Sequence, residues 1–342
     1  MKEKNSKKVD LADNERKALV ERIFIKFPRL NGLLEKIAYC HEHSKIAAEP
    51  ECLLITGYQG AGKTTLCREY ARRYPTIITR EKKIVPVLAT FVPSITTKKG
   101  LPTKLLNALG DGAAERGTAI SQTFRIIKMV KDCGVEIIIL DEFQHFIDSD
   151  SKIILDSISN WLKDLINETH KPVVLVGLPY SEIILQANPQ LERRFSMRES
   201  LDPFSWDDPV GKKEFKSFLD LLDCRLPFPR KSNLAAAEIS FRLYCATNGF
   251  IGYLMKLVRR AAILAIDRAA DRVNLELLAE SYDERLASRT PKKLNPFEVE
   301  FEELRIEPFE QLEFIRRRTN RRSKARSVSE SAADILTRKK SK

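Results

Sequence analysis

Residues 57–64 read Gly-Tyr-Gln-Gly-Ala-Gly-Lys-Thr and match the phosphate-binding pattern G-x-x-x-x-G-K-[ST] at every fixed position. In such a loop the backbone N–H groups surround the β-phosphate, the lysine reaches the β and γ oxygens, and the hydroxyl binds Mg²⁺. We therefore expect Lys63 and Thr64 to act on a nucleoside triphosphate. The predicted nucleotide-binding residues are Gly57, Tyr58, Gln59, Gly60, Ala61, Gly62, Lys63, Thr64 and Thr65.

Two acids follow the apolar run "VEIIIL" and complete the segment 135–142. An acid at the end of a buried strand beside the phosphate loop can hold Mg²⁺ through water, and a neighbouring acid can orient the attacking water. Asp141 is the predicted metal residue, with Thr64, and Glu142 is the predicted catalytic base. Lys63, which reaches the β and γ oxygens, is also predicted to be catalytic. The alternative is that Glu142 caps the following turn. Because no N-K-x-D motif of GTPases is present, the predicted cofactors are ATP and Mg²⁺.

A pair of arginines lies in the segment "NPQLERRFS", residues 188–196, after the last predicted strand. Arg193 and Arg194 are either a solvated helix face or an arginine finger. A finger completes the ATP site of a neighbouring subunit and neutralises charge in the transition state. A finger that acts in trans implies self-assembly into a ring or filament with heterologous contacts. The sequence does not choose between the two arginines.

The elements around these motifs alternate between short apolar runs and amphipathic segments. This alternation predicts an α/β fold with a doubly wound parallel sheet, helices on both faces (αβα), and a ligand at the carboxyl ends of the strands. The predicted strands are 51–57, 83–93, 135–142 and 171–179. The predicted helices are 63–74, 101–109, 118–132 and 154–169.

After Pro203 the pattern becomes entirely helical, which predicts a smaller all-α lid domain. Its predicted helices are 206–223, 233–247, 250–268 and 274–287. The expected domains are a flexible N-terminus over 1–21, an ATPase domain over 22–205 with a lead-in segment over 22–48, a lid over 206–289, and a C-terminal segment over 290–342. The aromatic and acidic stretch from Phe297 either docks a partner or packs on the lid.

The net charge of +12 and the pI near 9.3 favour polyanionic partners. Residues 315–342 form a basic tail with eleven Lys or Arg against two acids. The chain has no run of 18 apolar residues and no apolar leader, so we expect a cytoplasmic protein without a membrane partner. The six cysteines are scattered without a C-x-x-C pair, which is typical of reduced thiols.

Taken together, the phosphate loop, the acidic strand end, "LERRF" and the helical lid resemble an AAA+ ATPase. Narrower features resemble the TniB/TnsC family, the transposition regulators of Tn7-like and CRISPR-associated transposons. These features are "FPR" before the core, "VPSITTKKGLPTKLLNALGDG" after the second strand, "LDEFQHF", "VVLVGLP", "NGFIGYLMKLVRRAA" in the lid and "NPF" after it. The resemblance covers about residues 22–297.

The resemblance implies ATP-dependent helical oligomers on double-stranded DNA. It also implies a link between a TniQ-type target selector, often with a CRISPR effector complex, and a DDE transposase of the TnsB/TniA type. Hydrolysis would disassemble the oligomer. DNA contacts are implied near the loop after the second strand and before the acidic strand, although a solvated polar loop is the alternative. The residues nominated for DNA binding are Thr97, Lys98, Lys99, Lys104 and Thr118.

Two positions depart from the AAA+ pattern and keep other functions open. Gly177 stands where many AAA+ proteins place a polar sensor, and the lid offers no arginine before Arg259, although Lys256 is an alternative cation. Both departures favour slow hydrolysis with ATP as an assembly switch. The other readings are a helicase loader or initiator of the Cdc6 or DnaC type, and an ATP-binding scaffold with little turnover.

Overall fold

The computed structural model describes residues 11–94, 97, 99–148, 152–186, 188–287 and 294–306. Within this part, the contacts divide the chain into two compact units. The sheet unit contains residues 32–59 and 63–201, and the helical unit contains residues 11–31, 60–62 and 202–306, each with the gaps just given. The basic tail 315–342 lies outside the described residues.

Five parallel strands form the centre of the sheet unit in the order β4-β5-β6-β1-β7. They are β1 (Leu53–Thr56), β4 (Val87–Phe91), β5 (Ile137–Asp141), β6 (Val173–Gly177) and β7 (Met197–Ser200). All five residues of β5 and of β6 are buried, as expected for central strands that helices cover on both faces. Thr56 pairs with Gly177 and Phe91 with Asp141, so the ends of these strands lie at one edge.

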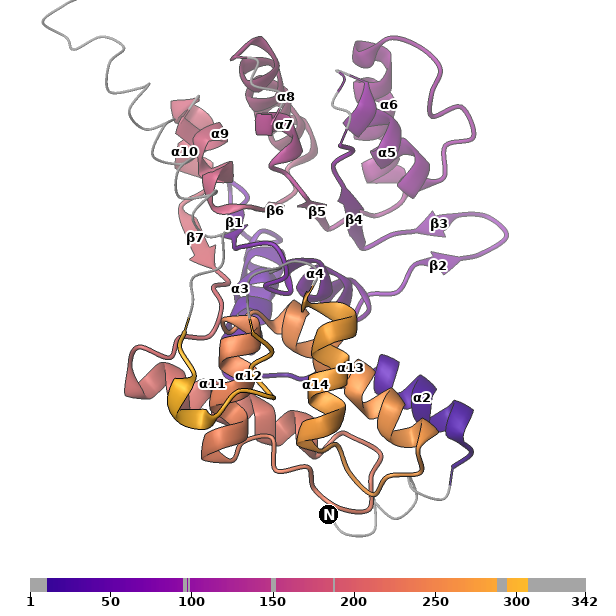
Figure 1. Cartoon of the computed structure of the whole chain (residues 1–342). Helices are drawn as coiled ribbons and strands as arrows, with labels where there is room; N and C mark the ends of the chain where they lie inside the picture. The colour runs from indigo at the N-terminus through magenta and orange to yellow at the C-terminus, as the bar shows by residue number, and fades with distance from the viewer. Residues whose placement is uncertain are drawn as a thin grey trace, which may run out of the picture. The chain divides into compact units, whose positions relative to one another are not determined.

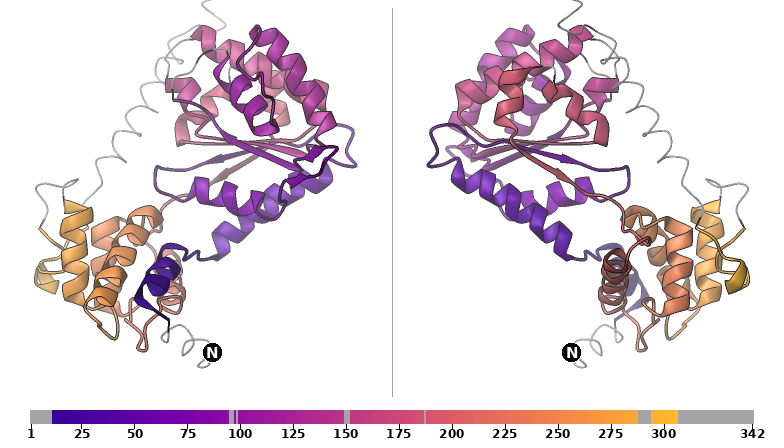
Figure 2. Two further views of the ribbon diagram at one scale, coloured as in Figure 1. Left: turned by 90° about the vertical axis from the view of Figure 1, so that its right-hand side faces the viewer. Right: turned by 90° about the vertical axis from the view of Figure 1, so that its left-hand side faces the viewer.

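Helices cover both faces of this sheet, which confirms the predicted doubly wound α/β fold. Figure 2 shows helices of the sheet unit below its strands and further helices of the same unit above them. The lower helices are α3 (Pro28–His43) and α4 (Lys63–Ala71). The upper helices are α5 (Gly100–Leu109), α6 (Ala119–Asp132), α7 (His145–Asp148), α8 (Lys152–Thr169), η1 (Pro179–Glu182), α9 (Ile183–Gln186) and α10 (Pro189–Arg194).

Two predictions about strands were incomplete. The run 83–93 is two strands, β3 (Lys83–Ile84) and β4, separated at Val85 and Pro86, and β3 pairs antiparallel with β2 (Ile77–Ile78). Proline has no N–H to donate to a ladder, which explains a break at this point. Strand β7 was not predicted, because it is an edge strand whose residues are all half-buried or exposed.

The helical unit contains α2 (Asp13–Glu21), α11 (Pro209–Asp223), α12 (Ala237–Thr247), α13 (Ile251–Asp267) and α14 (Leu275–Arg285). The last four confirm the predicted helices. Figure 1 shows α2 beside α13, where Lys17 makes an ion pair with Asp267. Residues 13–21, which were expected within a flexible N-terminus, therefore form a packed helix.

The segment 294–306, with η3 (Phe301–Glu303), packs on the helical unit instead of standing apart from it. Asn295 Nδ2 donates to the carbonyl of Ala279 at 3.0 Å, and Arg242 donates to the carbonyls of Pro296 and Val299. The described part of this stretch therefore packs on the helical unit, and docking of a partner by this segment stays a prediction. Within the described chain, no helix has the length and apolar character needed to cross a bilayer.

Candidate nucleotide-binding site and flanking surfaces

The loop after β1 has the backbone that its glycines predict. Gly57 leaves the strand by donating its N–H to the carbonyl of Gly177 at 3.0 Å. A β-carbon on Gly57 would overlap the carbonyl oxygen of Leu201, so a larger residue does not fit. Gly60 and Gly62 have φ angles of 81° and 102°, which L side chains rarely adopt. The chain then enters α4, whose first residues are Lys63 and Thr64.

Lys63 turns back onto this loop. Its Nζ donates to the carbonyls of Gly57 at 2.8 Å and of Tyr58 at 3.0 Å, and the residue is only 6% exposed. Burial lowers the pKa of the lysine from its ordinary value, although Glu142 and Asp141 oppose the shift. A buried cation gains from an anionic partner, so the arrangement is chemically suited to phosphate oxygens.

Asp141 and Thr64 meet across the edge of the sheet. The Thr64 hydroxyl donates to Asp141 Oδ2 at 2.6 Å, and the N–H of Glu142 donates to Oδ1 at 2.8 Å. Burial raises the pKa of the Asp141 carboxyl above its usual value despite these two donors. A nearby cation would reverse that shift, because it favours the charged carboxylate.

The donor set at this edge fits Mg²⁺. A hydroxyl and a buried carboxylate are hard oxygen ligands, and Mg²⁺ in nucleotide sites takes one or two protein ligands together with water and phosphate oxygens. Among the described residues, no cluster of three or more His, Cys, Asp or Glu could hold a metal by itself. Thr64 and Asp141 thus suit an ion that arrives with a nucleotide.

Glu142 is half-buried beside Asp141, and its backbone has a φ of 58°. This left-handed conformation costs about 1–2 kcal/mol for an ordinary L-residue. It is held by hydrogen bonds on either side, from the Glu142 N–H to Asp141 and from the Phe143 N–H to the carbonyl of Val176 at 2.9 Å. The Glu142 carboxylate accepts a hydrogen bond from Gln144 Nε2. The site thus fixes both the backbone and the side chain of this acid.

The structure distinguishes Arg193 from Arg194. Arg194 is 15% exposed, donates to Asn167 Oδ1 at 2.6 Å, and accepts a hydrogen bond from the Cys52 N–H on its own carbonyl. The Arg193 side chain is 79% exposed, and its Nη2 lies 3.8 Å from Glu49 Oε1. Arg194 Nη1 lies 3.9 Å from the other oxygen of the same carboxylate. Arg194 is therefore held by a hydrogen bond within the chain, whereas the Arg193 side chain is exposed.

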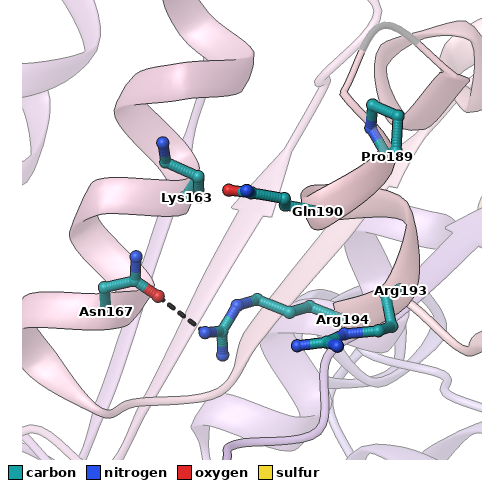
Figure 3. Close-up of a pocket in the computed structure, with 6 residues that line it drawn as sticks. All are labelled: Lys163, Asn167, Pro189, Gln190, Arg193 and Arg194. Atoms are coloured by element: carbon teal, nitrogen blue, oxygen red, sulfur yellow. Dashed lines mark hydrogen bonds between the residues drawn. The ribbon is translucent and has the colours of Figure 1, made fainter.

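Both arginines line an open polar pocket of about 420 Å³ between α8 and α10. Figure 3 shows the Arg194 guanidinium directed at Asn167 and the Gln190 amide directed toward Lys163. The remaining lining residue is Pro189. Three cations and two amides around one opening favour an anionic group from outside the subunit.

The residues nominated for DNA binding lie on the segment that contains α5 and α6. Thr97 and Lys99 are exposed immediately before α5, and Lys104 within it lies 5.0 Å from the ring centre of Phe91. Thr118 is exposed and caps α6 by accepting the N–H of Ser121 at 3.2 Å. Lys98 lies outside the described residues. Their contact with DNA stays a prediction.

Sequence reasoning missed two polar residues at this edge of the sheet, Gln144 and Ser181. Both are buried, at 4% and 0% exposed, and both lie beside Gly177. The available signal was an amide among aromatic residues in "LDEFQHF", where a core position would be apolar.

Comparisons with known proteins agree with this architecture. The model of the family described as "Bacterial TniB protein" matches residues 16–205, more than half of the chain. The Aeropyrum pernix ORC1 protein in complex with DNA is 16% identical, with a TM-score of 0.56, over 80% of this chain and 70% of that one. The Cdc6p protein of Pyrobaculum aerophilum is 14% identical, with a TM-score of 0.58, over 79% and 71%.

The ADPNP–ADP complexes of the Aeropyrum pernix ORC2 protein give a TM-score of 0.56 at 15% identity, over 79% of this chain and 71% of that chain. At these identities the likeness establishes the fold alone. No curated protein matches the sequence. The family match and the strand order around a phosphate loop lead to one conclusion: the chain belongs to the TniB family and has the AAA+ fold.

Proposed function

We propose that this protein is a Mg²⁺-dependent ATPase that assembles on double-stranded DNA and regulates transposition. In this proposal the sheet unit is the ATPase module and the helical unit is its lid. The observation that carries the proposal is the hydrogen bond of 2.6 Å between Thr64 and Asp141, with Glu142 directly beside it, in a member of the TniB family. This arrangement places two metal-binding oxygens and a candidate base at the end of the phosphate loop.

The residues would divide the work of hydrolysis. Lys63 would exchange its two loop carbonyls for β- and γ-phosphate oxygens, and Thr64 and Asp141 would hold Mg²⁺. The metal, when bound, neutralises charge on the β- and γ-phosphates. Glu142 would orient the attacking water and accept its proton. The strained backbone at Glu142, with φ of 58°, supports a functional role more than a turn cap, because such strain is typically retained at working sites.

Arg193 is the proposed arginine finger. It is the accessible member of the pair, and a finger must reach the ATP of a neighbouring subunit. Because this finger would act in trans, each ATP site would be complete only in the oligomer. Assembly and ATP turnover would therefore be coupled. Hydrolysis would then dissolve the oligomer. A TniQ-type selector and a DDE transposase are the proposed protein partners.

The experiment that tests this proposal combines imaging with turnover. Purified protein is examined on double-stranded DNA with a non-hydrolysable ATP analogue, with ADP and with ATP. Rings or filaments should form with the analogue and dissolve with ATP. Glu142→Gln should bind ATP normally and remain assembled, whereas Lys63→Ala should not assemble. Monomers in every state would refute the assembly proposal.

The initiator or helicase-loader reading has one specific observation in its favour. Solved structures with TM-scores above 0.5 include the ORC1 protein with DNA and the Cdc6p protein. A replicative helicase that is recruited by this protein in an ATP-dependent pull-down would favour that reading. A scaffold without turnover would bind ATP and assemble on DNA, but wild type and Glu142→Gln would then dissociate at the same rate.

A further inference from the structure

The carboxyl end of β6 lacks a side chain where it borders Glu142. The last residue of the strand is Gly177, and β6 lies next to β5, which carries Asp141 at its end. A β-carbon built on Gly177 would overlap Ser181 Oγ and would lie 3.1 Å from Gln144 Oε1. The space that a polar side chain at this position would need is therefore filled by two polar groups from elsewhere in the chain.

Gln144 joins the end of β6 to the candidate base. Its Nε2 donates to the Glu142 carboxylate, and its Oε1 accepts the Leu178 N–H at 3.2 Å. Because a carboxylate only accepts and a backbone N–H only donates, one orientation of the amide satisfies both partners. The amide is 4% exposed, so water does not compete freely for these bonds. The Gln144 amide thereby links the Glu142 carboxylate to the backbone N–H of Leu178, directly after β6.

Ser181 offers a second possible hydrogen-bond partner for the Gln144 amide. It is fully buried in η1, and its Oγ has no hydrogen-bond partner in the described part of the chain. Buried hydroxyls in native proteins are almost always paired, so an unpaired one needs an explanation. A β-carbon on Gly177 would meet both Ser181 Oγ and Gln144 Oε1, so the hydroxyl lies near the oxygen of the amide.

We propose that Gln144 is a positioning residue for Glu142 and that Ser181 is the alternative hydrogen-bond partner of its amide. When Glu142 turns toward the attacking water, Gln144 Nε2 loses its acceptor. Ser181 Oγ, which lies near the amide oxygen, can then donate to Gln144 Oε1 beside the Leu178 N–H and hold the amide in place. The two residues together replace the polar side chain that Gly177 lacks, and they link the state of the base to η1. The inference rests on the proposed hydrolysis and deepens it.

Apolar side chains around the end of β6 would support the strand equally well but would not orient a carboxylate. An amide between two fixed partners holds the carboxylate in one direction. Precise orientation of a base matters because small displacements of a reacting group reduce rates strongly. A purely structural pair would instead affect folding stability and leave the chemistry intact.

The test uses the full-length protein and separates chemistry from stability. Single-turnover ATP hydrolysis, the affinity for an ATP analogue and the melting temperature are measured for Gln144→Leu, Gln144→Glu and Ser181→Ala. Gln144→Glu preserves shape but places a second carboxylate against Glu142. Ser159→Ala is the matched control, because Ser159 is also buried and its Oγ donates to the carbonyl of Leu155 at 2.8 Å.

We expect both Gln144 variants to lose about tenfold or more in the hydrolysis rate, with analogue affinity changed less than about twofold. Ser181→Ala should also slow hydrolysis, yet leave the melting temperature unchanged or higher, because it removes an unpaired hydroxyl. Ser159→Ala should show the opposite pattern, with a lower melting temperature and an unchanged rate.

A double-mutant cycle decides whether Gln144 acts through Glu142. In the Glu142→Gln background the further change Gln144→Leu should have no additional effect on the residual rate. An equal effect in both backgrounds overturns the inference, as does a Ser181→Ala rate equal to wild type. If wild type hydrolyses ATP no faster than Lys63→Ala, the proposed hydrolysis itself is refuted. Normal hydrolysis by wild type together with unaffected Gln144 variants would refute only the role of Gln144.

Discussion

The hydroxyl of Thr64 donates a hydrogen bond of 2.6 Å to Asp141 Oδ2, although 77 residues separate them in the chain. The bond joins the first turn of α4 to the end of β5. It brings together the two oxygen donors that a nucleotide-bound Mg²⁺ would need. The hydrogen bond therefore fixes the relative positions of these two groups, which would reduce the ordering that metal and nucleotide binding requires.

The first prediction concerns pH and Mg²⁺. Burial raises the pKa of Asp141 above its ordinary value of 3.8, so its protonated form persists to higher pH than that of an exposed aspartate. Mg²⁺ needs the carboxylate, so the gain in ATP affinity on adding Mg²⁺ should shrink as the pH falls toward the raised pKa of Asp141, before an exposed aspartate would protonate. Calorimetric titration with and without EDTA measures this gain. Thr64→Val should show a small gain at every pH, and a pH-independent gain in wild type would contradict the prediction.

The second prediction separates the two arginines. Arg193→Ala should abolish turnover of assembled protein without changing stability, because its side chain is exposed. Arg194→Ala should lower the free energy of unfolding by about 1–3 kcal/mol, because it breaks the hydrogen bond to Asn167. Denaturant unfolding and DNA-stimulated ATPase assays measure the two effects.

Mixing tests whether Arg193 acts in trans. Arg193→Ala and Glu142→Gln are each expected to be inactive alone. In mixed assemblies, an Arg193→Ala subunit would keep its own base and receive the finger of a Glu142→Gln neighbour. Turnover should therefore reappear on mixing. If mixtures stay as inactive as their components, Arg193 does not act across the interface.

The third prediction concerns His41, a fully buried residue of α3. Its Nδ1 lies 2.9 Å from the Tyr70 hydroxyl and its Nε2 lies 2.9 Å from Glu136 Oε2, and Lys45 lies 2.8 Å from the same carboxylate. Burial is the largest cause of a pKa below the ordinary 6.5. The unfolded chain therefore binds a proton that the folded chain does not, and stability falls as pH drops below about 6.5.

The slope from this one group should reach at most about 1.4 kcal/mol per pH unit. Urea unfolding between about pH 7.5 and pH 5 measures it in wild type and in His41→Gln. The variant lacks the titrating ring and should show a flatter dependence over this interval, even if it is less stable at pH 7. Parallel curves would show that His41 does not cause the pH dependence.

The fourth prediction concerns the salt dependence of DNA binding. If Lys99 and Lys104 each neutralise one phosphate, replacing either by alanine should reduce the slope of log K against log salt by about 0.9. Thr118→Ser keeps the cap on α6 and should bind DNA normally. Lys213→Ala, an exposed lysine of α11, is the matched control and should leave the slope unchanged. Equal slopes in all variants would place the DNA contacts elsewhere.

Features that depend on contiguous residues could be predicted from the amino-acid order. The backbone of the phosphate loop could be predicted from its glycines because a φ angle is a property of a single residue. Gly60 and Gly62 do have the positive φ angles that glycine favours. The buried strands β5 and β6 were predicted because strands covered on both faces are apolar throughout. The helices α11 to α14 followed from their periodicity. Edge strand β7 and the break at Pro86 were missed because exposed strands carry a weak apolar pattern.

The contacts between residues that are distant in the chain become visible only in the folded protein. Arg194 donates a hydrogen bond to Asn167, whereas the Arg193 side chain is exposed. Two adjacent arginines in a sequence do not reveal this difference. The fold also placed Gln144 and Ser181 against Gly177, so a position that lacks a side chain gained polar neighbours from two other segments. The physical reason is that hydrogen bonding and burial depend on neighbours in space, which the order of residues along the chain does not specify.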